Sequence, residues 1–222
     1  IQDLSEPPVA EVLQRVVSDR CNVVVTGATG SGKTTLLGAM ASAVRPHERL
    51  VTVEDAAELN IDRVHVVRME ARPPNCEGVG EVTVRDLVRN ALRMRPDRIV
   101  VGEVRGAEAF DMLQALNTGH DGSLSTCHAN GPGDALRRLA TMVLMASPGL
   151  SVEVADALVA GSVDVVVHMV RAGAARRVSE VLEVRPPGSD PPVRALVVGG
   201  CVLPAALATG GADGMDGSRW GR

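Results

Sequence analysis

Aromatic residues are nearly absent from this sequence. Phe110 and Trp220 are the two aromatic residues among 222, and there is no tyrosine. The apolar fraction is nevertheless 45%, enough for a sizeable core, so that core must consist mainly of valine, leucine, alanine and methionine. The charged fraction of 23% is ordinary for a globular protein, and the length allows one or two domains, including one large α/β domain.

Paired cysteines and long apolar runs are also lacking. The cysteines form no C-x-x-C pair, which excludes a standard zinc knuckle and gives no disulfide framework; they are Cys21, Cys76, Cys127 and Cys201. This usage favours a reducing, cytoplasmic setting. The most apolar late stretch, residues 195–209, contains Gly199, Gly200 and Pro204. It falls short of the ~18 continuous apolar residues of a spanning helix, so no spanning segment is expected.

The N-terminus shows neither an initiator methionine nor the charged and apolar regions of a signal peptide. We therefore expect the chain to be a piece of a longer protein. Its formal net charge is −4. Because proteins that contact nucleic-acid phosphates broadly are usually basic, no specific nucleic-acid partner is expected.

Lysine is the scarcest charged residue. Lys33 is the one lysine among 23 basic residues, and the others are arginine. Codon bias in a GC-rich genome explains the excess of arginine but not the place of the exception. The place of Lys33 therefore indicates a site where a compact ammonium group is needed and the planar fork of arginine fits less well.

Apolar periodicity predicts strands that alternate with helices. This order is typical of an α/β fold, here a mostly parallel sheet flanked by helices. The expected strands are residues 23–26, 50–53, 64–69, 99–101, 123–127, 163–170 and 176–184. The expected helices are residues 3–20, 33–44, 107–118, 134–146 and 152–160, with another that opens at Thr83 and is closed by Pro96.

The domain prediction divides the chain after Val184. Residues 1–184 form the α/β domain, with a short β-containing part at its end. Residues 185–222 are predicted to be a proline- and glycine-rich linker with a disordered tail over 210–222.

The segment that follows the first strand fits the pattern G-x-x-x-x-G-K-[ST]. Glycines let backbone N–H groups close around phosphate oxygens, the helix N-terminus adds partial positive charge, and the lysine neutralises the terminal phosphates. The alternative is an ordinary Gly/Ser turn, but the strand before and the helix after it favour a phosphate loop. The predicted nucleotide-binding residues are Gly27, Ala28, Thr29, Gly30, Ser31, Gly32, Lys33, Thr34 and Thr35.

Three polar side chains stand at the ends of other predicted strands. Glu54 ends the second strand, Glu103 follows residues 99–101, and His128 follows residues 123–127. Because parallel strands end at one edge of the sheet, we expect these side chains to converge on one crevice. Gly102 stands where many phosphate-loop enzymes have aspartate, which leaves Glu103 as the acid at that strand end. Taken singly, each of the three also fits a solvated loop residue.

The segments GATGSGKTT, VTVEDAAEL, DLVRNALRMRPDRIVVGEVRG and GHDGSLSTCHANGPGDALRRL together resemble the type II and type IV secretion ATPases. The resemblance covers residues 1–184 and is nearest to the Tad/Flp pilus assembly branch. It implies a RecA-like P-loop NTPase fold with a Walker A loop, an acidic box, an atypical Walker B with Gly-Glu, and a histidine box.

The resemblance also implies roles for individual residues. Lys33 and Thr34 would bind the phosphates of ATP and Mg²⁺, with Thr34 as the metal ligand. Glu103 would be the general base, and Glu54 would position water or metal. His128 would contact the γ-phosphate region. Arg105 would pair with an acid or with a neighbouring subunit.

The implied function is an ATPase motor for pilus assembly, protein secretion or conjugal transfer. Such motors are homo-oligomeric rings, here a hexamer, on the cytoplasmic face of the inner membrane, where they act on a platform protein. Because residues 1–22 alone precede the first predicted strand, we expect the N-terminal domain that gives arginines to the next subunit's nucleotide to be missing. A truncated nucleotide-binding module with little turnover is therefore the alternative, and a nucleic-acid-translocating motor is a third, weakened by the acidic charge.

Arginines recur every four residues on the helix that opens at Thr83: Arg85, Arg89 and Arg93. This spacing places them on one helix face. The face is either solvated or part of a subunit interface.

Overall fold

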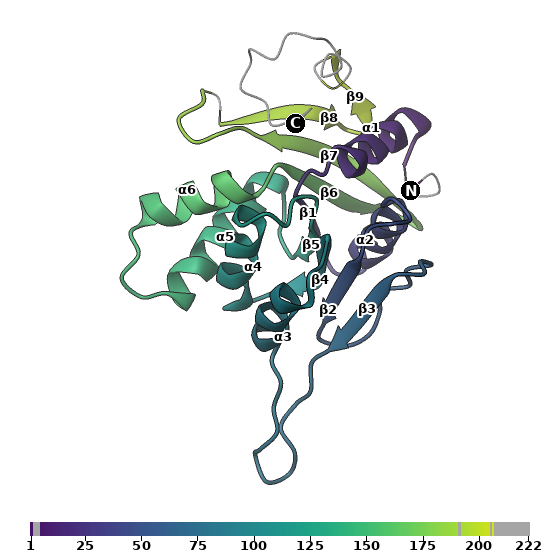
Figure 1. Cartoon of the computed structure of the whole chain (residues 1–222). Helices are drawn as coiled ribbons and strands as arrows, with labels where there is room; N and C mark the ends of the chain where they lie inside the picture. The colour runs from purple at the N-terminus through teal and green to yellow at the C-terminus, as the bar shows by residue number, and fades with distance from the viewer. Residues whose placement is uncertain (2–4, 191, 205, 207–222) are drawn as a thin grey trace.

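One nine-stranded sheet with helices on both faces organises the chain (Figure 1). The computed structural model describes residues 1, 5–190, 192–204 and 206. The strand order is β3-β2-β4-β5-β1-β6-β7-β8-β9. The strands are β1 (Val23–Gly27), β2 (Leu50–Glu54), β3 (Val66–Glu70), β4 (Arg98–Val104), β5 (Leu124–Cys127), β6 (Val165–Ala172), β7 (Ala175–Val184), β8 (Val193–Val198) and β9 (Cys201–Val202).

The helices form two layers, each over its own apolar core. They are α1 (Pro7–Ser18), α2 (Lys33–Ser42), α3 (Val84–Ala91), α4 (Glu108–Asn117), α5 (Pro132–Ala146) and α6 (Val152–Ser162). One core lies under α1 and α2, and the other lies under α3 to α6. Both consist mainly of valine, leucine, alanine and methionine, as the composition predicted.

The five strand pairs from β3 to β6 are parallel, and the pairs from β6 to β9 are antiparallel. The predicted α/β fold with a mostly parallel sheet is therefore confirmed. Parallel pairing also brings the carboxyl ends of β1, β2, β4 and β5 to the same edge of the sheet.

The linker prediction is wrong for residues 193–202. β8 pairs with β7 and β9 pairs with β8, so the sheet continues beyond Val184. Leu196 and Val197 are fully buried, and Arg194 Nε lies 2.6 Å from Glu183 Oε2 of the neighbouring strand. The prolines that suggested a linker stand before β8, where their missing N–H groups cost the ladder nothing. The predicted disordered tail, residues 210–222, lies outside the described residues.

The helix that follows the projecting β3–α3 loop begins as predicted. Thr83 accepts from the backbone N–H of Asp86, and Asp86 Oδ2 accepts from that of Thr83, which is a capping box. Arg85 and Arg89 both bind Asp111 of α4, so the chain's own acid neutralises this part of the basic face. Arg93 lies in the short 3₁₀ turn that follows the helix.

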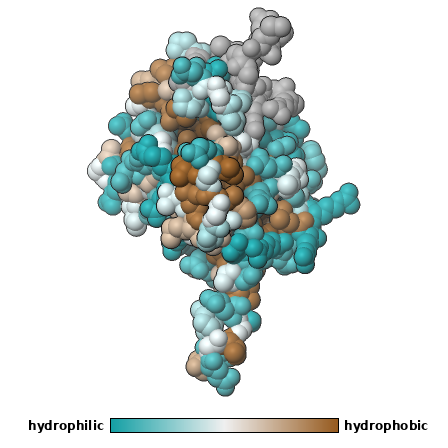
Figure 2. Space-filling model, turned by 90° about the vertical axis from the view of Figure 1, so that its left-hand side faces the viewer, coloured by the Kyte–Doolittle hydropathy of each residue, from teal (hydrophilic) through white to brown (hydrophobic). Residues whose placement is uncertain are grey.

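The surface has two conspicuous features. The loop of residues 71–83 projects from the body, as both whole-molecule views show (Figures 1 and 2). Apolar side chains gather on the face turned toward the viewer in Figure 2, and the exposed apolar residues of α5 and α6 are Met145, Val152 and Val154. Within the described part of the chain, no helix is both long and apolar enough to cross a membrane.

Candidate nucleotide-binding site

A glycine-rich loop joins β1 to α2, and its shape depends on three glycines. Gly30 and Gly32 have φ of 72° and 95°, in the left-handed region that favours glycine. Gly32 is also the N-cap of α2, and no side chain caps this helix end. The first N–H groups of α2 are therefore open to an anion. Ser31 Oγ is buried and has no hydrogen-bond partner among the described residues, as expected of a hydroxyl in a cradle for a polar ligand.

Gly27 gives the first testable consequence of the loop geometry. Its φ is 149°, and a Cβ there would lie 2.4 Å from the backbone oxygen of Met169. We expect Gly27→Ala to lower the free energy of unfolding by about 3 kcal/mol, because backbone strain and a clash with main chain act together. Gly30→Ala is the matched control, since nothing lies within 4 Å of its Cβ position, and it should cost about 1 kcal/mol. Urea unfolding measures both, and equal losses would contradict the assigned geometry.

Lys33, the first residue of α2, points back over the loop. Its Nζ donates to the backbone oxygen of Ala28 at 3.0 Å and lies 3.3 Å from Nε2 of His128. The side chain is buried, which lowers its pKa, while the charge of Glu103 opposes that shift. The one lysine of the chain thus stands where the terminal phosphates of a nucleotide would be neutralised.

A β-bulge in β4 places Glu103. Val101 pairs with Ser125 and Val104 with Cys127, so two β4 residues face one β5 residue. Thr126 holds the bulge by donating its Oγ1 hydrogen to the backbone oxygen of Gly102 at 2.7 Å. Bulges re-aim side chains, and this one brings Glu103 toward the phosphate loop.

Glu103 lies among three cationic or ionisable groups. Its Oε2 accepts from Arg105 Nη2 at 2.6 Å, and its Oε1 lies 3.2 Å from His128 Nε2. Oε1 is buried and accepts no hydrogen bond among the described residues. Burial alone would raise the pKa of Glu103, but the hydrogen bond and charge of Arg105, with the charges of His128 and Lys33, hold it below its ordinary value. Glu103 is therefore a carboxylate at neutral pH, with one oxygen left for a water molecule.

His128 follows β5 directly and lies between Lys33 and Glu103. Burial lowers its pKa, and the Lys33 charge lowers it further, against the opposing charge of Glu103. The ring is therefore neutral at pH 7. Its Nε2 accepts from Lys33 only when it carries no proton and donates to Glu103 only when it carries one. His128 Nε2 can therefore donate a hydrogen bond to Glu103 only when Lys33 no longer donates to it.

Glu54, at the end of β2, fills the space beside Gly102. Its Oε1 accepts from the backbone N–H groups of Glu58 and Leu59 at 2.9 and 2.8 Å. A Cβ on residue 102 would lie 3.0 Å from Cγ of Glu54. The side chain of Glu54 from the neighbouring strand thus lies where a side chain at residue 102 would begin.

A pocket of about 80 Å³ adjoins the loop; its lining is Thr34, Glu54, Asp55, Ala56, Glu58, Gly102, Glu103 and Arg105. No cluster of three or more His, Cys, Asp or Glu that would hold a metal occurs among the described residues. Mg²⁺ keeps several waters and is bound by few protein groups together with substrate phosphates. Thr34 and Glu54 supply oxygen atoms to the lining of this pocket, so they could contribute to such a site. Thr35 is exposed and lines a separate hollow of about 450 Å³ with Thr34.

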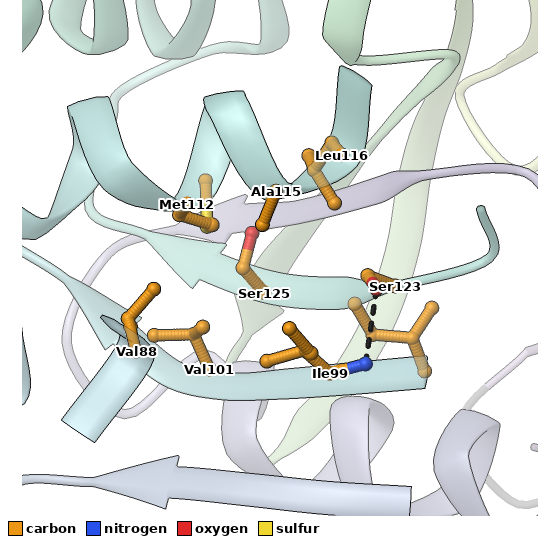
Figure 3. A pocket seen from close by; sticks show the side chains of 9 residues that line it. Val88, Ile99, Val101, Met112, Ala115, Leu116, Ser123 and Ser125 are labelled. Carbon is orange, nitrogen blue, oxygen red and sulfur yellow. Dashed lines mark hydrogen bonds between the residues drawn. The ribbon is translucent and has the colours of Figure 1, made fainter. Parts of the chain in front are cut away.

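A further cavity lies in the core and is too small to hold a substrate. It has a volume of about 10 Å³ between β4, β5 and α4, and the side chains that line it are mostly apolar (Figure 3). A space of this size holds at most one water molecule. The hydrogen bond from the backbone of Ile99 to Ser123 Oγ, 3.0 Å long, closes its end.

The structure thus brings Lys33, Glu103, His128 and Arg105 within one connected group of contacts, with Glu54 and Thr34 in the adjoining pocket. The sequence analysis missed Arg176 of β7, whose Nε donates to the backbone oxygen of Gly30 at 3.1 Å. Its one signal in the sequence was the group of arginines around Gly173, which lies far from the loop along the chain.

Comparison with known proteins finds one family model and several similar proteins. A family model described as type II/IV secretion system protein matches residues 3–195. A putative conjugal transfer protein of Mycobacterium tuberculosis is 53% identical over 172 residues, which are 78% of this chain and 48% of the relative. The protein VirB11 of Agrobacterium fabrum is 38% identical over 172 residues, 76% of this chain and 49% of the relative. The chain spans about half the length of these curated relatives.

Comparison with solved structures finds similar folds. The VirB11 ATPase of the Brucella suis type IV secretion system, in complex with sulphate, superimposes with a TM-score of 0.71 at 38% identity. The match covers 78% of this chain and 51% of that one. The pilus retraction motor PilT with bound ADP, at 20% identity and a TM-score of 0.58, shares the fold.

Proposed function

The chain belongs to the type II/IV secretion system protein family, and we propose that it is the ATP-hydrolysing part of a motor for secretion, conjugal transfer or pilus assembly. One observation carries the proposal. Glu103 has a buried oxygen that accepts no hydrogen bond within the described part of the chain, and it lies beside a phosphate loop and next to Lys33 and His128. A phosphate-binding group and a carboxylate oxygen that can orient water are two of the parts used for attack of water on a γ-phosphate.

Binding uses the loop between β1 and α2. The open N–H groups at the start of α2 surround the phosphates, and Lys33 exchanges its contact with Ala28 for one with the terminal phosphates. Thr34 would hold Mg²⁺ with Glu54 near it, and the ion would supply positive charge to the phosphates. His128 then loses Lys33 as a donor and turns to the γ-phosphate side of the site.

Hydrolysis uses Glu103. The carboxylate accepts a hydrogen bond from water and takes its proton as the water oxygen bonds to the γ-phosphorus. The bond from that phosphorus to the bridging oxygen breaks, which gives ADP and phosphate. Arg105 fixes the carboxylate through its 2.6 Å contact with Oε2. His128 lies beside the other carboxylate oxygen, Oε1.

The wider assembly is proposed from the family. A homo-oligomeric ring, a hexamer, works at the cytoplasmic face of the inner membrane against a platform protein there. The relatives named for conjugal transfer and type IV secretion support this class of process. The Tad/Flp branch stays a prediction, while β8 and β9 continue the sheet past the predicted boundary at Val184.

Lys33→Ala tests the binding step. We expect it to weaken MgATP binding by at least about a hundredfold, because a phosphate-neutralising cation in a partly buried site is lost. Isothermal calorimetry measures the affinity, and phosphate release measures turnover by the unaltered chain. Unchanged ATP binding by the variant would overturn the phosphate-loop assignment. ATP binding by the unaltered chain without phosphate release would instead favour the alternative, a truncated nucleotide-binding module.

A further inference from the structure

The β6–β7 hairpin extends past the end of β1 along the phosphate loop. Gly27, the last residue of β1, pairs with Met169, and β6 continues to Ala172. The chain then turns and returns as β7 from Ala175. Three more residues of β6 and the first residues of β7 therefore lie beside the loop rather than beside a strand.

Arg176 of this hairpin contacts the loop at two points. Its Nε donates to the backbone oxygen of Gly30 at 3.1 Å. Its Cδ lies 3.1 Å from the position that a Cβ on Gly32 would take. The guanidinium group is thus held against the loop, and its two terminal nitrogens have no hydrogen-bond acceptor among the described residues.

The charges on the hairpin are uncompensated. Arg176 stands directly opposite Arg171 in the β6–β7 register, and like charges in that position repel. Neither arginine takes part in an ion pair among the residues that the structure describes; Arg171 Nε donates to the backbone oxygen of Gly173 at 3.0 Å. Two facing cations beside an anion-binding loop are stabilised when an anion lies between or near them.

We propose that Arg176 binds the phosphate groups of the nucleotide held by the loop, with the charge of Arg171 beside it. The inference rests on the proposed function and adds a cationic ligand from the β6–β7 hairpin. Nε holds the loop through Gly30, and the terminal nitrogens reach the phosphate oxygens. Arg176 therefore acts in binding and does not take part in the proton transfer at Glu103.

The experiment compares Arg176→Ala, Arg176→Lys and the control Arg177→Ala. Arg177 is exposed, is the next residue of the same hairpin and pairs with Val170, so its side chain leaves the other face. We expect Arg176→Ala to raise the Kd for MgADP and the KM for MgATP roughly tenfold, the effect of losing one charge-assisted contact to phosphate. The kcat should stay within about twofold, Arg176→Lys should recover part of the affinity, and Arg177→Ala should match the unaltered chain.

Two results would overturn the inference. One is a Kd for Arg176→Ala equal to that of Arg177→Ala. The other is an equal loss of affinity in Arg176→Ala and Arg176→Lys together with a lower melting temperature, which would mean that the side chain only supports the loop. If the unaltered chain binds no nucleotide and Lys33→Ala changes nothing, the proposed function itself has failed, and this outcome is distinct from the first two.

Discussion

Glu103→Gln is expected to lower the rate of phosphate release by about 10²–10⁴-fold while MgATP still binds, because the variant lacks the proton acceptor for the attacking water. Glutamine has the same shape, and its oxygen still accepts from Arg105, so the bulge and its contacts should persist. The loss should therefore fall on kcat, with KM little changed. Single-turnover phosphate release and calorimetric titration with ATP separate these quantities.

The control for this variant is Glu153→Gln, the same chemical change at an exposed position in the first turn of α6. It should retain normal turnover. Phosphate release at the normal rate by Glu103→Gln would remove Glu103 from the chemistry. A variant that loses ATP binding as well as turnover would show that Glu103 acts by holding the site together, which also contradicts its role as base.

The pKa of Glu103 affects its proposed role as the proton acceptor. Its ion pair with Arg105 keeps the carboxylate charged at neutral pH, but a low pKa also makes it a weak proton acceptor. Loss of the pair with Arg105 would raise the pKa of Glu103 and make it a stronger proton acceptor in the proposed mechanism. Arg105 is suited to such a change, since its side chain is 64% exposed.

Much of the site followed from the sequence because it depends on short-range patterns. The strand, loop and helix around Lys33 are contiguous, and the parallel sheet then dictates that Glu54, Glu103 and His128 end at one edge. The spacing of apolar residues was sufficient to find the strands from β1 to β7.

The parts that the sequence did not predict depend on contacts between distant segments. The bulge at Gly102 and Glu103 exists because Thr126 of another strand holds it. Arg176 reaches Gly30 across 146 positions of the chain. β8 forms a strand because the edge of β7 offers hydrogen-bonding groups. The prolines that precede β8 had suggested a linker there. Periodicity contains no information on any of these pairings.

At the opposite edge of the sheet, where the parallel strands begin, lies a buried ion pair that no sequence pattern predicts. Arg98 is fully buried, and its Nε and Nη2 donate to the two carboxylate oxygens of Glu48 at 2.8 and 2.9 Å. Its Nη1 donates to the backbone oxygens of Val17 and Gly122. The pair therefore ties the end of α1 and the turn before β5 to the start of β4.

Glu48→Gln is expected to lower the free energy of unfolding by about 3–5 kcal/mol, because it leaves the Arg98 charge buried without its counter-ion. For a domain of this size the melting temperature should fall by roughly 10 °C. The control is Asp134→Asn, which breaks an exposed pair with Arg137 and should cost less than about 1 kcal/mol. Urea unfolding of the two variants gives the comparison, and equal small losses would contradict a structural role for the buried pair.

The pH dependence of that difference gives an independent test of the pair. Burial alone would raise the pKa of Glu48, but the hydrogen bond and charge of Arg98, the charge of Arg20 and a backbone hydrogen bond lower it. A carboxyl whose pKa is lower in the folded state stabilises the fold above its ordinary pKa and loses that contribution as pH falls through the folded value. The unaltered chain should therefore exceed Glu48→Gln in stability at pH 7 and approach it under acid conditions. A difference that stays constant down to strongly acid pH would show that the carboxylate charge is not what stabilises Arg98.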